Sequence, residues 1–150
     1  MVKVYDVPAD LLIDKLSSIL KEEEILLPKW VPFVKTSSHK KRPPHENNWW
    51  YTRCASILRK IYLYGPISIN DLRSIYGGNR AIRYSTSNHK DASGSIIRII
   101  VYNLEKLEYV RKTKRGRMIS SSGMKKLDRL SANILNQLCE TNPSLKIYTK

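Results

Sequence analysis

The chain has 150 residues, of which 41% are hydrophobic, and this length suits one domain with one buried core rather than two independent domains. Its 27 Lys and Arg outnumber its 13 Asp and Glu, which gives a formal net charge of +14. Such a charge repels itself in a compact chain unless a polyanion neutralises it, and an enzyme of small metabolites seldom needs so strong a field. A polyanionic partner is therefore expected, and RNA is the first candidate.

The sequence carries no membrane or export signal. No run of about 18 apolar residues could span a bilayer, and the N-terminus lacks the basic-then-apolar order of a secretory signal. We therefore expect a cytoplasmic protein. Cys54 and Cys139 are the only cysteines, so a disulfide framework is not indicated.

The first predicted helix begins near Asp6-Val7-Pro8, because Asp6 or Val7 can stand near the N-cap and Pro8 fits the first turn. It runs to about Glu23, and its apolar residues follow helical spacing: Ala9, Leu12, Leu16, Ile19 and Leu20. Six of the 13 acids lie in the first 24 residues, so this helix should face away from a polyanion.

Residues 25–47 contain four prolines, each of which holds the residue before it in an extended conformation. This segment, which we call the strap, is expected to be irregular. Its apolar anchors should be Trp30, Val31, Phe33 and Val34. The basic half of the strap, residues 35–42, should then stay exposed.

Asn48 can cap a second helix, which Gly65-Pro66 ends. One face of this helix is apolar and should join the core: Trp50, Cys54, Ile57, Leu58 and Ile61. Another face has an indole at its head, followed by polar and basic residues: Trp49, Arg53, Ser56 and Lys60. From Lys29 to Tyr64 the sequence holds eight Lys and Arg against one acid, Glu46.

Two more helices are expected before a basic hairpin. Residues 67–69 suit only a short strand, and Ser68 to Asp71 has the form of a capping box for a short helix that ends at Tyr76-Gly77-Gly78. A polar loop, residues 79–92, should follow. A strong helix then starts at residues 93–95. It turns Ile97, Ile100, Leu104 and Leu107 inward and leaves Ser95, Arg98 and Tyr102 outside.

Residues 109–112 and 117–120 flank a turn at 113–116, which predicts a β-hairpin with five basic residues between positions 111 and 117. Ser121 or Ser122 should cap a last helix that turns Leu127, Leu130, Ile134 and Leu138 inward. The tail from about residue 141 shows no packing pattern. The order predicts a mostly α fold within a single domain, residues 1–150: a winged helix-turn-helix with additional N- and C-terminal helices and a basic β-hairpin wing.

A charge run is usually a solvated face, but here an indole, an arginine and a lysine share one side of a helix beside a basic strap. Base stacking and phosphate pairing need that mixture. Trp49 is the better stacking candidate, because Trp50 heads the apolar face. The candidate RNA-binding residues are Lys35, His39, Lys40, Lys41, Arg42, Trp49, Arg53, Ser56, Arg59, Lys60, Arg98, Arg111, Lys112, Lys114, Arg115 and Arg117.

Other functions find less support in the sequence. The three histidines lack metal-ligand or catalytic partner spacing, and no dinucleotide fingerprint or P-loop occurs, so no cofactor, metal, small-molecule substrate or enzymatic activity is expected. An RNA-modifying enzyme is a further alternative, but the sequence shows no recognisable catalytic constellation for it. The main alternative is a winged-helix DNA-binding regulator. The helix that would read base edges, however, has Arg98 as the single arginine on its exposed face. The apolar stripe of the last helix is short enough to pack within the chain, so we expect a monomer.

Several blocks of the sequence resemble the archaeal and eukaryotic family of small-subunit ribosomal protein nineteen of the eukaryotic type, which is distinct from the bacterial protein of that number. The resemblance covers roughly residues 2–138, and its matching blocks read VPADLLIDKL, WVPFVKT, HKKRPP, WWYTRCASILRKIYLYGPISINDLRSIYGG, SGSIIRIIVYNLEKLEYV and GRMISSSG. The loop after Gly78, often densely basic in the family, holds only Arg80, Arg83 and Lys90 here, and Arg98 precedes Ile99 rather than a lysine.

The resemblance implies a winged-helix protein of the head of the small ribosomal subunit, without enzymatic activity. It implies binding to ribosomal RNA beside neighbouring small-subunit ribosomal proteins, and a role in subunit assembly and maturation. The family's basic surface would fall on Lys35, Lys40, Lys41, Arg42, Arg53, Arg59, Lys60, Lys112, Lys114, Arg115 and Arg117.

Overall fold

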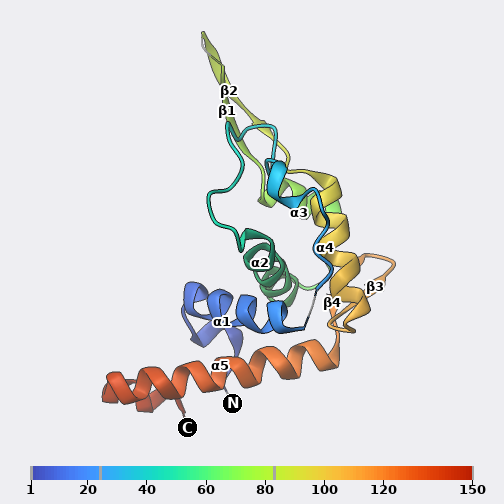
Figure 1. The fold of residues 1–150 in the computed structure, drawn as a ribbon. Helices are drawn as coiled ribbons and strands as arrows, with labels where there is room; N and C mark the ends of the chain where they lie inside the picture. The colour runs from blue at the N-terminus through green and yellow to red at the C-terminus, as the bar shows by residue number, and fades with distance from the viewer. Residues whose placement is uncertain (1, 24, 83, 150) are drawn as a thin grey trace.

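A computed structural model describes residues 2–23, 25–82 and 84–149 (Figure 1). The α-helices of this part are α1 (Ala9–Glu22), α2 (Trp49–Tyr64), α3 (Ile69–Ile75), α4 (Gly94–Lys106) and α5 (Ser121–Thr141). Two antiparallel hairpins join β1 (Gly78–Ile82) to β2 (Ser85–Lys90) and β3 (Val110–Thr113) to β4 (Gly116–Ile119). Short 3-10 helices lie at Val4–Asp6, Val31–Phe33 and Pro143–Thr149.

Helices α2, α3 and α4 and the β3–β4 wing form the predicted winged helix-turn-helix. The predicted short strand at 67–69 is reduced to Ile67, which pairs with Arg117 of the wing through backbone N···O distances of 3.0 and 2.8 Å. Residue 69 instead begins α3, because Ser68 and Asp71 close the predicted capping box. Pairing with Ile67 fixes the wing against the start of α3.

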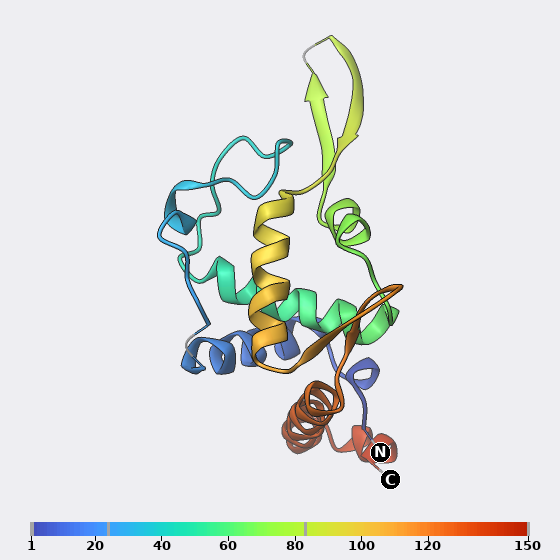
Figure 2. The ribbon, with the colours of Figure 1, turned by 90° about the vertical axis from the view of Figure 1, so that its right-hand side faces the viewer.

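The two additional helices lie outside this unit, as the sequence predicts. Helix α1 packs against α2 and α5, and α5 lies at the opposite end of the molecule from the β1–β2 hairpin (Figures 1 and 2). Lys126 of α5 bonds both the Glu23 carboxylate and the Tyr109 hydroxyl, which ties α5 to the end of α1 and the start of the wing. The largest fully buried side chains of α1 and α2 are Leu12, Leu16, Leu20, Trp50, Ile57, Leu58 and Ile61.

The predicted polar loop at 79–92 is wrong, because most of it forms the β1–β2 hairpin. This hairpin projects from the body (Figure 2), and its two strands satisfy each other's backbone groups. Residues 78–90 show no alternation of apolar and polar residues, so the usual strand signal is absent from the sequence. Glycine is required at its base, since a Cβ on Gly77 would stand 2.5 Å from the Lys90 carbonyl oxygen.

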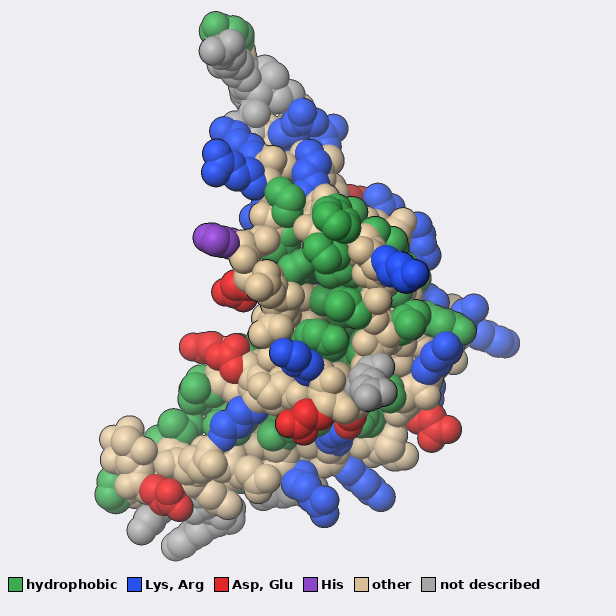
Figure 3. Space-filling view, in the orientation of Figure 1, with side chains coloured by type: hydrophobic (Ala, Val, Ile, Leu, Met, Phe, Trp, Pro, Cys, Tyr) green, Lys and Arg blue, Asp and Glu red, His purple; other side chains and the backbone are tan. Residues whose placement is uncertain are grey.

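The strap is irregular apart from one 3-10 turn, as predicted. It runs alongside α4, where the Leu26 carbonyl accepts from Asn103 at 3.2 Å and the Thr36 carbonyl accepts from the Ser93 amide at 3.1 Å. Val31 is buried, whereas Phe33 is 82% exposed and is not the predicted anchor. The 3-10 turn that buries Val31 turns Phe33 outward. Figure 3 shows that apolar side chains also gather at the centre of the face of the molecule that it draws.

The predicted details of α5 need two corrections. Ser120, rather than Ser121 or Ser122, caps the helix by accepting a hydrogen bond from the Gly123 amide. The buried side of α5 holds Leu127, Ser131, Ile134, Leu135 and Cys139, and Leu130 and Leu138 are only half-buried. The inward stripe is therefore rotated, because α5 packs against both α1 and the N-terminal segment.

The C-terminal tail, the start of α2 and the two cysteines complete the comparison with the predicted elements. The tail, for which the sequence shows no pattern, forms a 3-10 segment that folds back on α5. Asn48 precedes α2 but its side chain makes no capping bond. No helix in the described ranges is long and apolar enough to cross a membrane. Both cysteines are free thiols in the interior.

Candidate nucleic-acid interface

A groove with a cavity volume of about 510 Å³ lies between the strap and α2. The strap contributes Thr36, Lys40, Arg42, Pro43, Pro44 and Glu46, helix α2 contributes Trp49, Thr52, Arg53 and Ser56, and Ile13 and Tyr76 complete the lining. Five of the predicted RNA-binding residues thus share one groove, although they come from two segments with different backbone conformations.

Tyr76, at the C-cap of α3, organises the polar side of α2. Its ring centroid lies 4.3 Å from the Arg53 guanidinium carbon and 5.6 Å from the Lys60 ammonium nitrogen. The Ser56 hydroxyl lies 2.7 Å from the Tyr76 hydroxyl, and burial raises the pKa of Tyr76 to about 12. Tyr76 is not among the predicted site residues, because a tyrosine that ends a short helix carries no spacing signal towards a different helix.

Arg53 is half-buried, and burial lowers the pKa of its guanidinium although the Coulombic interaction with Tyr76 opposes that shift. Within the described ranges its side chain forms no salt bridge and no hydrogen bond. An arginine stays charged in proteins, so its N–H groups remain available to an anion. Arg59 is also half-buried, and its Nε has no hydrogen-bond partner among the described residues.

The structure corrects the prediction for Trp49. Its side chain is only 9% exposed and meets Trp50 edge to face, with ring centroids 5.7 Å apart. The indole therefore lines one wall of the groove and is not an open stacking platform. Burial follows from its place at the first turn of α2, where the strap enters the helix.

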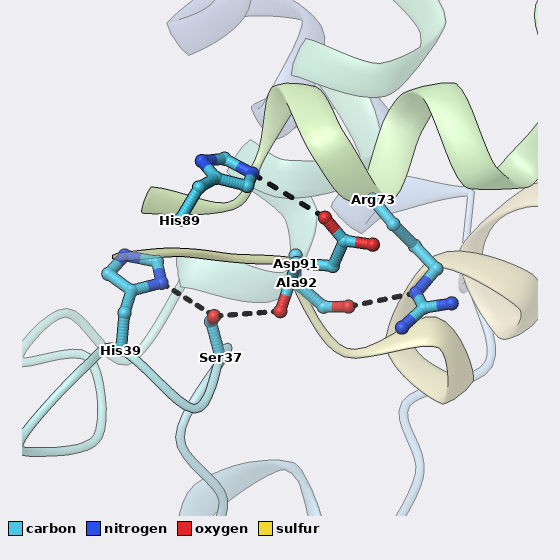
Figure 4. Close-up of polar contacts among 6 residues, drawn as sticks. All are labelled: Ser37, His39, Arg73, His89, Asp91 and Ala92. Atoms are coloured by element: carbon cyan, nitrogen blue, oxygen red, sulfur yellow. Dashed lines mark hydrogen bonds and ion pairs between the residues drawn. The ribbon is translucent and has the colours of Figure 1, made fainter. Parts of the chain in front are cut away.

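A cluster of polar contacts fastens the strap to the base of the β1–β2 hairpin (Figure 4). The Ser37 hydroxyl donates to the Asp91 carbonyl at 3.2 Å, so the His39 Nδ1 atom, 2.6 Å from the same hydroxyl, must be the donor in their bond. Burial, Lys40 and His89 lower the pKa of His39. His39 is thus held as a neutral strap contact, which weakens the prediction that it binds an anion.

Two further contacts complete this cluster. His89 lies 3.4 Å from the Asp91 carboxylate, and Arg73 Nε donates to the Ala92 carbonyl at 3.2 Å (Figure 4). Together they hold the chain that joins β2 to α4. The basic half of the strap is consequently fixed next to the hairpin base.

The other predicted cations divide into separate surfaces. Lys35, Lys40, Lys41 and Arg42 are exposed on the strap, Arg98 is exposed on α4, and Arg111, Lys112, Lys114 and Arg115 are exposed on the wing. Arg117 differs, because its Nε lies 3.3 Å from Glu105 and the pair is half-buried. On the face shown in Figure 3, Lys and Arg gather below the hairpin tip and most Asp and Glu lie lower.

The wing and the basic half of the strap, residues 35–42, lie at opposite ends of α4 (Figures 1 and 2). The structure therefore does not bring these two predicted surfaces together. The described residues include no group of three or more His, Cys, Asp or Glu that could hold a metal ion. The geometry provides a basic groove between the strap and α2 and a basic β3–β4 wing on one helical body.

Comparisons with known proteins identify the family of the chain. The family model of ribosomal protein S19e matches residues 3–137. The small ribosomal subunit protein eS19 of Aeropyrum pernix is 42% identical, with 99% of each chain covered. The Thermoplasma volcanium protein of the same name is 42% identical over 95% of this chain and 96% of its own. Protein eS19A of Schizosaccharomyces pombe is 38% identical over 93% and 98%. The chain therefore belongs to the ribosomal protein S19e family.

Proposed function

We propose that this chain is a structural component of the small ribosomal subunit that binds ribosomal RNA and supports subunit assembly and maturation. Its family consists of non-enzymatic ribosomal proteins of the cytoplasm, so no catalytic step is needed. One observation carries the RNA-binding part: strap and α2 converge on a groove in which Arg53 has no anionic partner among the described residues.

The proposed mechanism is neutralisation and positioning of phosphates. Cations on the strap and on the wing lie at opposite ends of α4, so a single rigid body would engage two stretches of RNA. Phosphate contacts set register and orientation, whereas the shape of folded RNA supplies the specificity. Neighbouring ribosomal proteins would cover other faces, and the chain would be a monomer before assembly.

The experiment compares variants of the full chain, each of which loses three exposed cations to Gln. The strap variant changes Lys40, Lys41 and Arg42, the wing variant changes Lys112, Lys114 and Arg115, and the control changes Lys3, Lys125 and Arg129. Binding to small-subunit ribosomal RNA and co-sedimentation with the small subunit are then measured at moderate and high salt.

We expect the strap and wing variants to be lost from the subunit at high salt while the control is retained. Removing three phosphate contacts should reduce the slope of log affinity against log salt by about 2. Equal behaviour of all three variants would contradict the assignment of these surfaces, since a diffuse charge effect would not distinguish them.

No observation favours the DNA-binding regulator. The strap runs alongside α4 and bonds it near both ends, at Asn103 and at Ser93, which limits how deeply α4 could enter a major groove. Arg98 remains the single arginine on its exposed front. The family gives the regulator no support either.

A further inference from the structure

The groove between the strap and α2 holds a charge that the described part of the chain leaves unbalanced. One face of the Arg53 guanidinium rests on the Tyr76 ring, 4.3 Å from the centroid. The side chain is half-buried and finds no carboxylate or carbonyl partner in the described ranges. A partly desolvated cation without a partner is unfavourable, and an entering anion would remove that penalty.

The rim of the groove also carries positive charge, which favours an anion. Lys40 and Arg42 lie on its strap side and are exposed. Glu46 is the only acid in the lining, and it forms no ion pair with another described residue. A phosphate next to Arg53 would therefore meet cations on both sides of the groove.

The walls of the groove are different in character from its rim. Pro43, Pro44, Trp49 and Ile13 supply apolar side chains to the lining. A phosphate alone would leave these surfaces in contact with water, whereas a nucleobase would cover them, since aromatic and apolar side chains are the usual platforms for unstacked bases. The cavity of about 510 Å³ lies in the range of sites for small molecules.

The size of the groove distinguishes double-stranded RNA from an unpaired nucleotide. A double helix keeps its bases stacked inside and presents only phosphates and riboses on a convex surface, so it could touch the rim without filling the groove. An unpaired nucleotide can insert its base and leave its phosphate at the mouth.

On these grounds we propose that the groove is a binding site for one unpaired RNA nucleotide, with its phosphate at Arg53 and its base against the Pro43–Pro44 wall, beside Trp49 rather than stacked on it. Tyr76 acts as a positioning residue, because it fixes the guanidinium without touching the nucleotide's phosphate. The inference rests on the proposed function and specifies which form of RNA its strap surface takes.

The test follows the Arg53 Nε–H and Trp49 indole N–H signals of the full chain by NMR. Four probes are added separately: adenosine monophosphate, inorganic phosphate, a short RNA duplex without loops or unpaired ends, and an oligoglutamate peptide. We expect adenosine monophosphate to shift both signals, phosphate to shift Arg53 alone, and the duplex to shift neither by a comparable amount.

Variants make the result specific. Arg53→Gln should weaken adenosine monophosphate binding about tenfold or more, since it removes charge-assisted hydrogen bonds. Arg129→Gln, which removes an exposed cation from α5, should leave the affinity unchanged. Retained amide dispersion in the spectrum of each variant shows that the fold is intact.

Three outcomes would overturn the inference: equal shifts with the duplex, no shift at the Trp49 indole, or equal shifts with an oligoglutamate peptide, which would point to an acidic protein segment. None of them would by itself refute ribosomal RNA binding. That function fails separately, if the strap and wing variants bind ribosomal RNA as tightly as the unaltered chain.

Discussion

At the scale of single residues, Tyr76 decides how the cations of α2 are presented. It contacts Arg53 and Lys60 through its ring and Ser56 through its hydroxyl. These three partners occur on one face of α2, so one aromatic ring aligns the whole polar stripe. Their common face was predictable from spacing, but the ring that orders them was not.

Replacing Tyr76 should separate the contribution of the ring from that of the hydroxyl. Tyr76→Phe loses the bond to Ser56 and should reduce the free energy of unfolding by about 1 kcal/mol. Tyr76→Leu also loses the contacts with Arg53 and Lys60, which should remove about 1–2 kcal/mol more and weaken RNA binding. Urea unfolding and a binding titration measure the two effects. Equal RNA affinity of the two variants would argue against a positioning role.

His39 gives the docking of the strap a dependence on pH. Its folded-state pKa lies below the usual 6.5, so the neutral ring is favoured in the folded chain and its contribution to stability is complete above the unfolded pKa. That contribution is lost as the pH falls through the folded value. Stability should therefore decrease from about pH 7.5 to about pH 5, and His39→Gln should reduce this dependence.

The groups around His39 indicate why protonation is unfavourable there. Lys40 and His89 both face it, and a Cβ on Gly78 would come within 2.7 Å of its Nε2 atom, so the ring is close to the hairpin backbone. His45→Gln, at an exposed strap position, serves as the control. A pH profile of unfolding that is the same for His39→Gln and the unaltered chain would contradict this interpretation.

At the scale of elements, the wing depends on a close backbone approach. Gly116 has φ +143°, a conformation that side chains rarely adopt, and a Cβ there would lie 2.6 Å from the Ile67 carbonyl oxygen. The hairpin itself was predictable from its turn and charges. Its attachment through Ile67 was not, because that pairing joins residues distant in the sequence.

Gly116→Ala should therefore detach the wing from Ile67 and reduce the free energy of unfolding by about 2 kcal/mol. The matched control is Gly94→Ala, where a Cβ would meet only flexible arginine side chains at 3.2 Å or more. Because alanine favours helix over glycine, that change should be neutral or slightly stabilising. Thermal unfolding of both variants measures the difference, and similar losses for the two would contradict the packing argument.

At the scale of the whole molecule, the core excludes both thiols from solvent. Cys54 is fully buried between helices, and burial raises its pKa to about 12, whereas Cys139 lies near the end of α5 with 7% of its surface exposed. The thiolate is the nucleophile that attacks a disulfide reagent, so a buried thiol reacts only when the structure opens. The order of labelling should follow the order in which the parts of the fold open.

A disulfide reagent should react with Cys139 first, as the end of α5 frays, and with Cys54 only at the rate of global unfolding. Cys139→Ala should leave a single slow phase. The reaction is followed by absorbance, with urea-unfolded chain as the reference for full reactivity. In the Cys139→Ala variant Cys54 of α2 is the remaining thiol. A fast phase there would show that α2 opens without global unfolding, which would contradict this prediction.

The sequence alone determined the helices, the wing, the family and the excess of positive charge, because helical periodicity, capping residues and charge are local properties. Tertiary structure decided which of the predicted RNA-binding side chains are free: Arg117 pairs with Glu105, His39 fastens the strap, and Trp49 is buried. It also decided that β1 and β2 form a projecting hairpin and that Tyr76 orders α2. The physical reason is the same in each case, since these features depend on contacts between segments far apart in the chain, which no local pattern encodes.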